Sequence, residues 1–252
     1  MFRYRAELHV HTVLSPCAEI EMIPMLIISK AEEMGINLLA ITDHNAIANV
    51  EAMQKAASGT EIKILPGMEL QTKEEVHVLC IFDHLSELQE LDSLVRKNFT
   101  EMKNKPEFFG EQFIVDETGE FLGREERLLI SSIDLGFDEA VETVNRLNGL
   151  AIPAHVNRQA YGLIANLGMV PANTHIDALE ISRHLDPREA VIKFPDLRSY
   201  PLLLGGDVHR LDEFLGANEF SMNEPSVNEI RQALNHQNGR SYRIRMEYLE
   251  KR

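Results

Sequence analysis

The sequence of 252 residues contains no tryptophan and only two cysteines, Cys17 and Cys80. Two cysteines cannot form a disulfide framework, which favours a reducing compartment. The first ten residues, MFRYRAELHV, lack the apolar centre of a secretory signal, and no apolar run approaches the roughly 20 residues needed to cross a bilayer. We therefore expect a cytoplasmic protein with no membrane partner.

Positive charge is also scarce. The sequence has 25 Lys and Arg against 40 Asp and Glu, which gives a formal net charge of −15. A field of this sign disfavours broad binding to nucleic acid or to anionic membranes. We therefore expect no long nucleic acid as a partner. Divalent metals in an acidic cleft would be the largest local charges there.

Length and composition indicate a globular protein. Hydrophobic residues make up 44% and charged residues 26% of the sequence, as in ordinary globular domains. The length fits one α/β barrel, so we expect residues 1–252 to form a single domain. The segment 105–127 has no clear period, and we interpret the region around 85–133 as an insertion or small subdomain.

Seven short apolar segments, mostly separated by helical patterns, predict the core strands. The segment 36–42, INLLAIT, is continuously apolar, which is typical of a strand buried on both faces. Strands that alternate with helices favour a parallel barrel or an open doubly wound sheet. The predicted strands lie at 6–10, 36–42, 62–65, 76–82, 150–153, 176–181 and 201–204, and the alternation within 239–252 favours a last strand.

Several residues mark predicted helix ends. Pro24 can begin a helix that Gly35 ends, and Asp186 followed by Pro187 reads as an N-cap with proline at the first helical position. Asn45 is a candidate cap for a helix that runs toward residue 59. A final helix is expected within 225–238.

The segment ELHVHT, residues 7–12, places two histidines one residue apart at the end of the first strand. Side chains alternate faces in an extended segment, so His9 and His11 share a face. Two histidines in an isolated motif of this kind often face solvent. Here other strands also end in imidazoles or carboxylates, where α/β barrels place their chemistry. These are Asp43 and His44, Glu69, His155, Glu180 with Arg183 and His184, and Asp207 with His209.

His77 begins its strand instead of ending it. Only about seven residues separate it from Glu69, whereas a parallel crossover needs a dozen or more. We therefore expect a hairpin, with the fourth strand antiparallel to the third. The start of that strand then lies beside the end of the third, and His77 joins the cluster.

The combined residues predict a metal centre. Imidazoles with carboxylates suit Zn²⁺, Mn²⁺ or Fe²⁺ better than Ca²⁺ or Mg²⁺. About nine potential ligands fit two or three metals, and the carboxylate of Glu69 can bridge two of them. Clusters of this kind activate water and hold a phosphoryl group.

The order of these motifs resembles the PHP (polymerase and histidinol phosphatase) superfamily. The motifs are HVHT with a following SPC, then ITDHN, GMEL, EVH, PAH and GGDVH, and they cover nearly all the chain except about 85–133. The resemblance implies a distorted (β/α)7 barrel with a trinuclear metal centre at the C-terminal strand ends. It also implies hydrolysis of phosphate esters.

Ligand roles follow from the resemblance, motif by motif. Glu69 would bridge two metals, and a metal-bound water would be the nucleophile. Cys17 stands where the family often has histidine or aspartate, so it is either a ligand of the third metal, favouring zinc, or a packing residue. The implied sets are His9, His11, Glu69 and Asp207 for one metal, Glu69, His77 and His155 for the second, and His44, His209 and Cys17 for the third.

Other polar residues are expected around the metals. Asp43 is expected behind the ligands, and Glu180 is either a ligand or a supporting carboxylate. Arg158, Arg183 and Arg210 follow the strand-end motifs, and with His184 they are candidates to bind a second anionic group of the substrate, because the guanidinium fork suits such groups.

These residues predict a metal-dependent phosphoesterase that hydrolyses a small phosphorylated metabolite or a nucleotide. One alternative is a nuclease or 3′-end trimming enzyme for short oligonucleotides. Another is a non-enzymatic metal-binding regulatory module, which the near-complete ligand set argues against.

Overall fold

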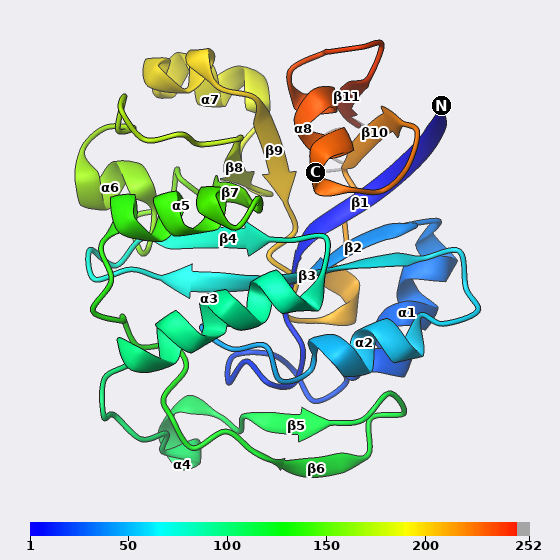
Figure 1. Ribbon diagram of the computed structural model, residues 1–252, viewed down its shortest axis with the longest axis vertical. Helices are drawn as coiled ribbons and strands as arrows, with labels where there is room; N and C mark the ends of the chain where they lie inside the picture. The colour runs from blue at the N-terminus through cyan, green and yellow to red at the C-terminus, as the bar shows by residue number, and fades with distance from the viewer. Residues whose placement is uncertain (246–252) are drawn as a thin grey trace.

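The computed structural model describes residues 1–245, and its centre is a curled seven-stranded sheet (Figure 1). Its strand order is β11-β10-β1-β2-β3-β4-β7, and β8 and β9 form a separate parallel pair. The core strands are β1 (Phe2–Val10), β2 (Leu38–Ile41), β3 (Lys63–Gln71), β4 (His77–Ile81), β7 (Leu150–Pro153), β8 (Leu179–Ser182) and β9 (Leu202–Gly205). All seven predicted strands are thus present.

Strand directions follow the prediction for the β3–β4 hairpin. β1, β2 and β3 run parallel, whereas β4 runs antiparallel to β3 with Gln71 opposite His77. β7 is in turn antiparallel to β4, so it points the same way as β3. The start of β4 therefore lies beside the C-terminal ends of its neighbours.

Backbone hydrogen bonds connect the segments that flank β8 and β9 to β7 on one side and to β1 on the other. Asp177 N donates to Ala151 O at 3.1 Å beside β7, and His11 N donates to Val208 O at 3.0 Å beside β1. Residues 1–245 thus show an α/β fold around a curled sheet. The closed (β/α)7 barrel remains a prediction.

Helices cover the sheet because its strands are apolar on both faces. Alternate residues of β2 enter different cores: Leu39 and Ile41 belong to the larger hydrophobic cluster, whereas Leu38 and Ala40 belong to a second cluster that includes Val227 and Ile230. The helices are α1 (Pro24–Met34), α2 (Val50–Ala56), α3 (Leu85–Lys97), α4 (Pro106–Phe109), α5 (Phe137–Arg146), α6 (Leu163–Leu167), α7 (Pro187–Lys193) and α8 (Val227–Leu234), with short 3-10 turns η1 (Pro195–Ser199) and η2 (Leu211–Glu213). Within residues 1–245 none of them is long and apolar enough to span a bilayer.

Most of the predicted helix ends are confirmed. Pro24 begins α1, Gly35 ends it in the left-handed conformation, and the Asp186 side chain accepts a hydrogen bond from Arg188 N at the start of α7. Asn45 is not a cap, because α2 begins only at Val50. The Asn45 side chain instead bridges segments, donating to Leu129 O and Ser131 O and accepting from Gln71 N.

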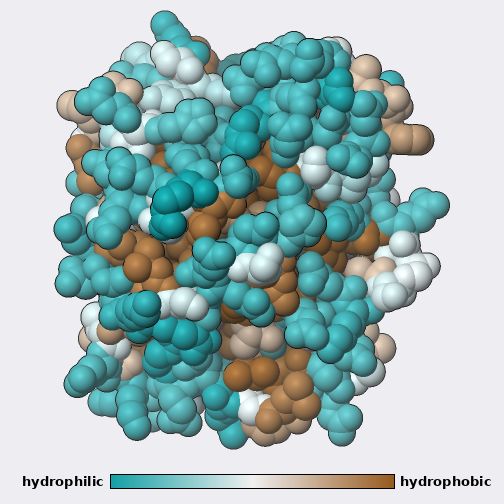
Figure 2. All heavy atoms as spheres, in the orientation of Figure 1, coloured by the Kyte–Doolittle hydropathy of each residue, from teal (hydrophilic) through white to brown (hydrophobic). Residues whose placement is uncertain are grey.

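The region without a clear period contains α4 and a hairpin of β5 (Phe113–Val115) and β6 (Phe121–Arg124). The hairpin lies apart from the main sheet and is tied to the segment after β1, since Phe113 N donates to Val13 O at 2.8 Å. Figure 2 shows a mostly hydrophilic face with hydrophobic side chains gathered over the hairpin, where Phe121 and Leu122 are exposed. An insertion around 85–133 remains our interpretation of this region.

Two more strands lie near the C-terminus. β10 (Asn218–Met222) pairs with β1 and was not predicted, because its half-buried, partly polar sequence gives a weak pattern. β11 (Ser241–Ile244) is the beginning of the predicted last strand. The rest of that prediction, residues 246–252, lies outside the described residues.

Candidate metal centre

The two histidines of the opening motif do share a face. His9 and His11 are both 0% exposed, and their Nε2 atoms lie 3.1 Å apart. The alternative of a solvent-facing pair is therefore wrong. Two imidazoles buried edge to edge define the floor of a polar cluster.

Glu69 lies at the centre of this cluster. It reaches that position because β3 continues to Gln71, past the predicted end of the strand. Its two carboxylate oxygens contact five imidazole rings. These contacts are Oε1 to His77 Nδ1 at 2.8 Å, to His9 Nε2 at 3.1 Å and to His155 Nε2 at 3.2 Å, and Oε2 to His44 Nδ1 at 2.9 Å and to His11 Nε2 at 3.4 Å.

Electrostatics keep Glu69 ionised. Burial alone would raise the pKa of its carboxyl, but His77, His9 and His44 outweigh burial and hold that pKa well below the usual range. Burial lowers the pKa of His77 to about 4, despite the neighbouring Glu69. Glu69 is thus a carboxylate and His77 a neutral imidazole with a lone pair, and both are groups that bind metals.

Asp207 closes the cluster on the side of β9. Its Oδ1 lies 3.3 Å from His9 Nε2, 3.4 Å from His11 Nε2 and 3.4 Å from His209 Nδ1. Asp207 has a positive φ of 46° and His155 one of 31°. Such values are rare for residues other than glycine and collect at functional sites.

Two glycines before Asp207 let the chain approach buried carboxylates. A Cβ on Gly205 would lie 2.1 Å from the carboxyl carbon of Glu180, and one on Gly206 would lie 2.8 Å from the Glu7 carboxylate. The Glu7 carboxylate accepts backbone hydrogen bonds from Gly206, Leu215 and Gly216 at 2.9–3.0 Å. Glu7 was not among the predicted site residues, although the GGD motif signals such a close approach.

The two predicted supporting carboxylates lie behind the histidines. Glu180 hydrogen-bonds His9 Nδ1 at 3.0 Å and accepts from His155 N at 3.1 Å. Asp43 accepts from Ser15 Oγ at 2.7 Å, and Ser15 Oγ in turn contacts His11 Nδ1 at 2.9 Å. Contacts of this kind orient imidazoles that bind metals. Ser15 was missed in the sequence, although it belongs to the SPC motif.

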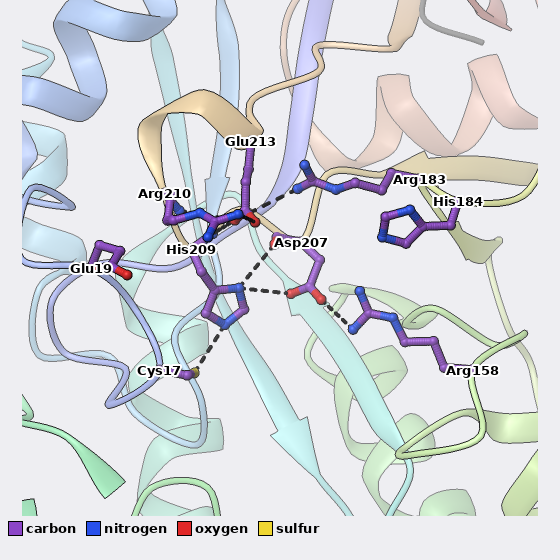
Figure 3. A pocket seen from close by; sticks show the side chains of 9 residues that line it. All are labelled: Cys17, Glu19, Arg158, Arg183, His184, Asp207, His209, Arg210 and Glu213. Carbon is purple, nitrogen blue, oxygen red and sulfur yellow. Dashed lines mark hydrogen bonds and ion pairs between the residues drawn. The ribbon is translucent and has the colours of Figure 1, made fainter. Parts of the chain in front are cut away.

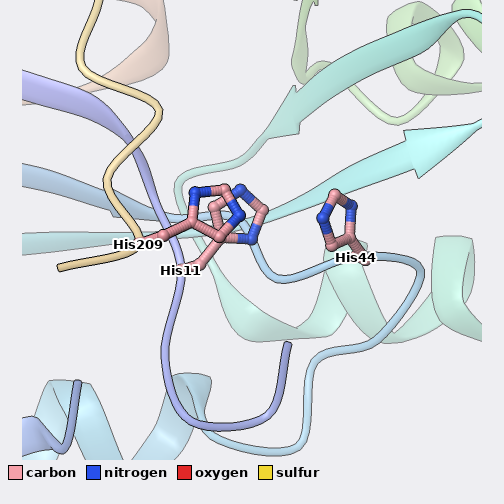
Figure 4. A group of neighbouring side chains, drawn as sticks. All are labelled: His11, His44 and His209. Carbon is pink, nitrogen blue, oxygen red and sulfur yellow. The ribbon is translucent and has the colours of Figure 1, made fainter. Parts of the chain in front are cut away.

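Cys17 lies at the open edge of the cluster. Its Sγ is 3.1 Å from His209 Nε2, and the His11 ring stacks on the His209 ring at 4.1 Å between centroids (Figure 4). Burial would raise the pKa of the Cys17 thiol, but His44 and His209 outweigh it and lower that pKa to about 6. Cys17 thus contacts one predicted ligand, and its own role as a ligand stays a prediction.

The residues present fit divalent metals. His44 Nδ1 and Glu69 Oε2 lie 2.9 Å apart without forming a hydrogen bond, and His155 Nδ1 is also buried without one. Buried polar atoms normally have partners, and atoms with lone pairs that converge can be satisfied by a cation. Three groups of side chains have ligand atoms within 4.8 Å of one another: His9, His11 and Glu69; His44, Glu69 and His77; and His11, His44 and His209.

A pocket of about 500 Å³ opens directly onto this cluster (Figure 3). Asp207 and His209 form part of its wall, and Arg158 Nη1 lies 2.5 Å from Asp207 Oδ2. Arg183 donates to Gly206 O, and Arg210 pairs with Glu213 at 3.0 Å. All four predicted substrate-binding residues line this pocket: Arg158, Arg183, His184 and Arg210. The carboxylates of Glu19 and Glu213 were not predicted.

The sequence model of the PHP domain matches residues 7–156, which is more than half of the chain. The chain belongs to the PHP family. The 5′-3′ exoribonuclease Rnm of Salmonella typhimurium (strain LT2) is 34% identical over 77 residues, 30% of this chain and 25% of that protein. This PHP chain thus spans a quarter of that curated relative.

Solved structures share the fold. The lesion-specific endonuclease PfuEndoQ of Pyrococcus furiosus aligns with a TM-score of 0.72 and 23% identity, over 96% of this chain and 58% of that one. Endonuclease Q in complex with a 27-mer duplex gives 0.69 and 22%, over 95% and 58%. A metal-dependent phosphoesterase of Bifidobacterium adolescentis gives 0.59 and 16%, over 92% and 96%. These solved structures therefore share the fold of this PHP chain, which spans a little over half of the two endonuclease chains.

The expectation of a small phosphorylated substrate, with long nucleic acid excluded, is wrong. Several proteins similar to this chain are nucleases, and the Endonuclease Q complex holds a 27-mer duplex. The physical error lies in using the net charge of −15. Net charge sums over the whole surface, whereas phosphates are bound locally, and three arginines gather in one pocket of this acidic molecule.

Proposed function

We propose that this PHP chain is a metal-dependent nuclease that hydrolyses phosphodiester bonds of nucleic acid. The observation that carries the proposal is the position of the arginine-lined pocket, which shares Asp207 and His209 with the candidate metal centre. A phosphate in the pocket would lie next to one at the centre. Successive phosphates of a nucleic-acid strand also lie next to each other, so one strand could occupy both positions.

The proposed ligands are the nine residues of the sequence prediction, arranged as two or three sites for Zn²⁺, Mn²⁺ or Fe²⁺. When bound, such metals polarise a phosphoryl group and activate water. One carboxylate oxygen of Glu69 contacts His9 and the other contacts His44, which supports a bridging role for Glu69. Glu180 and the Asp43–Ser15 pair hold the rings of His9 and His11 in orientation.

The arginines are proposed to bind the neighbouring phosphate. Arg183 is held by Gly206 O, and Arg210 is held by Glu213, which also accepts hydrogen bonds from the backbone of His209 and Arg210. Guanidinium groups fixed in this way lose little freedom on binding an anion. His184 adds a further polar side chain to the same wall.

Cys17 is proposed as a ligand of the third metal, together with His44 and His209. A thiolate in that position would favour zinc at this site. A ligand thiol also needs to stay reduced, which supports the expected cytoplasmic location.

A substrate comparison tests the proposed function. Purified protein comprising residues 1–252, supplied with Zn²⁺, Mn²⁺ or Fe²⁺, would be incubated with a dinucleotide, a single-stranded oligonucleotide, a duplex and an aryl phosphate monoester. We expect metal-dependent cleavage of at least one oligonucleotide at a higher kcat/KM than that of the monoester. Hydrolysis of the monoester alone, with every oligonucleotide intact, would contradict the proposal.

A further inference from the structure

A second pocket, of about 240 Å³, lies beside the arginine-lined one and differs from it in chemistry. The two pockets share Cys17, Arg158, Asp207 and His209, so they adjoin at the candidate metal centre. The second pocket has walls of its own in Gln71, Ile130 and Tyr161. It brings an aromatic ring and an aliphatic side chain to the edge of a cluster that is otherwise polar.

Tyr161 stacks directly on a proposed metal ligand. Its ring lies parallel to that of His77, with 4.5 Å between centroids and 9° between planes. Yet Tyr161 is 41% exposed and lines the pocket. Core packing therefore does not account for the ring, which remains accessible to a ligand.

The backbone holds Tyr161 in an unfavourable conformation. Its φ is +60°, which is rare for an aromatic residue. The carbonyl of Tyr161 accepts a hydrogen bond from His77 N at 3.1 Å. The next residue is Gly162, where a Cβ would lie 2.1 Å from Arg158 O, so the turn is tight. Strain of this kind collects where a side chain has a defined task.

Gln71, another residue that lines this pocket, is held at both ends of its amide. The Gln71 amide contacts His77 Nε2 at 3.2 Å through its oxygen and donates to Ser132 Oγ at 2.9 Å through its nitrogen. With both ends engaged, Gln71 offers a fixed flat surface. A flat ring in this pocket would therefore meet preformed walls.

We propose that Tyr161 is the platform on which a nucleobase stacks, next to the scissile phosphate and on the side away from the arginine-lined pocket. The inference rests on the proposed nuclease function and adds to it a position that binds a base on one side of the scissile bond. Aromatic side chains stack on any base, so the contact would favour nucleic acid over other phosphate esters without reading sequence.

A base-free substrate tests this contact. Cleavage of an oligonucleotide would be compared with cleavage of the same strand carrying a tetrahydrofuran spacer in place of the nucleoside on one side of the scissile bond, then on the other. For the wild-type chain we expect the spacer to raise KM by about five- to a hundredfold on one side only, as loss of a stacked base does. In Tyr161→Leu the ratio of the KM for the spacer strand to the KM for the intact strand should fall to about one. Tyr161→Phe should keep the ratio of the wild-type chain.

The same data separate stacking from a merely structural role. If Tyr161→Leu weakens cleavage of both strands equally and the ratio persists, Tyr161 only supports His77, and the inference is wrong while the nuclease function stands. If the wild-type chain cleaves no oligonucleotide, the proposed function fails, and a binding measurement decides the inference.

That measurement uses the absence of tryptophan in the sequence. Tyr161→Trp places a single indole in the pocket of the metal-loaded protein. Adenosine 5′-monophosphate should quench its fluorescence, whereas ribose 5-phosphate, which has no base, should not. Equal responses to both compounds, or no response to either, would overturn the stacking platform.

Discussion

The Nε2 atoms of His9 and His11 lie 3.1 Å apart in the protein interior, and the Nδ1 of each ring is already engaged. His9 Nδ1 faces the Glu180 carboxylate, which only accepts hydrogen bonds when ionised. The proton of neutral His9 therefore sits on Nδ1, and Nε2 turns its lone pair to the centre. The tautomer that a metal needs is thus set by a carboxylate behind the ring.

Removing the central carboxylate should empty the centre. We expect the wild-type chain to carry about two to three transition metals and Glu69→Ala to fall below about one, with loss of hydrolysis, since the metals share this group. Elemental analysis of the two proteins, each purified without chelator, measures their metal content. The matched control is Glu117→Ala, because Glu117 is an exposed carboxylate in the β5–β6 turn. Full metal content in Glu69→Ala would contradict the bridging role.

Cys17 should be the reactive thiol of the chain. Its pKa is lowered to about 6, so the thiolate predominates above that pH and is lost below it. Alkylation of chelator-treated protein by iodoacetamide should therefore rise with a midpoint near pH 6, and Zn²⁺ should suppress it. Cys80 is the internal control, because it is buried and burial raises the pKa of its thiol.

Mass spectrometry of the modified peptides distinguishes the two cysteines. A midpoint near the ordinary thiol pKa of about 8.5, or alkylation that Zn²⁺ leaves unchanged, would return Cys17 to the packing alternative. Cys17→Ser should then keep every metal, whereas the ligand role requires selective loss of one.

Arg158→Ala should impair binding of nucleic acid more than chemistry on a minimal substrate. Loss of one charge-assisted contact costs roughly 1.5–3 kcal/mol, or about ten- to a hundredfold in kcat/KM for an oligonucleotide. An aryl phosphate monoester has no second anionic group and should be affected less. The control is Arg243→Ala on β11, where Arg243 pairs with Glu219 at 2.8 Å. Metal content is measured in parallel because Arg158 also contacts Asp207, and equal losses on both substrates would reject the anchoring role.

Glu7→Gln should destabilise the segment that carries Asp207. The Glu7 Oε2 atom accepts hydrogen bonds from Leu215 N and Gly216 N. If the amide NH₂ of the substituted side chain took this position, three hydrogen-bond donors would meet without an acceptor. We expect a loss of about 1–3 kcal/mol in the free energy of unfolding, measured by urea titration. Glu224→Gln, at an exposed position beyond β10, is the control. Unchanged stability in Glu7→Gln would contradict this role.

Much of the site could be predicted because its ligands follow strand ends. The period of two placed His9 and His11 together, and the short β3–β4 connection placed His77. Glu7, Ser15 and Tyr161 were missed. Their roles depend on contacts that local pattern does not encode, such as that of Glu7 with Gly206, 199 residues away. The strand pattern also cannot settle whether the barrel closes or how many metals bind, because both depend on contacts between segments far apart in the sequence.

The charges of this molecule act over two length scales. At 0.1 M salt, charges more than about 10 Å apart are largely screened, and at lower salt their interaction reaches further. At low salt an approaching strand therefore meets the field of a protein with net charge −15 before it meets the arginines. Added salt would first weaken that long-range repulsion and then the direct phosphate contacts. If the proposed nuclease function holds, association with nucleic acid should therefore be fastest at an intermediate ionic strength, and this acidic protein should respond to salt in both directions.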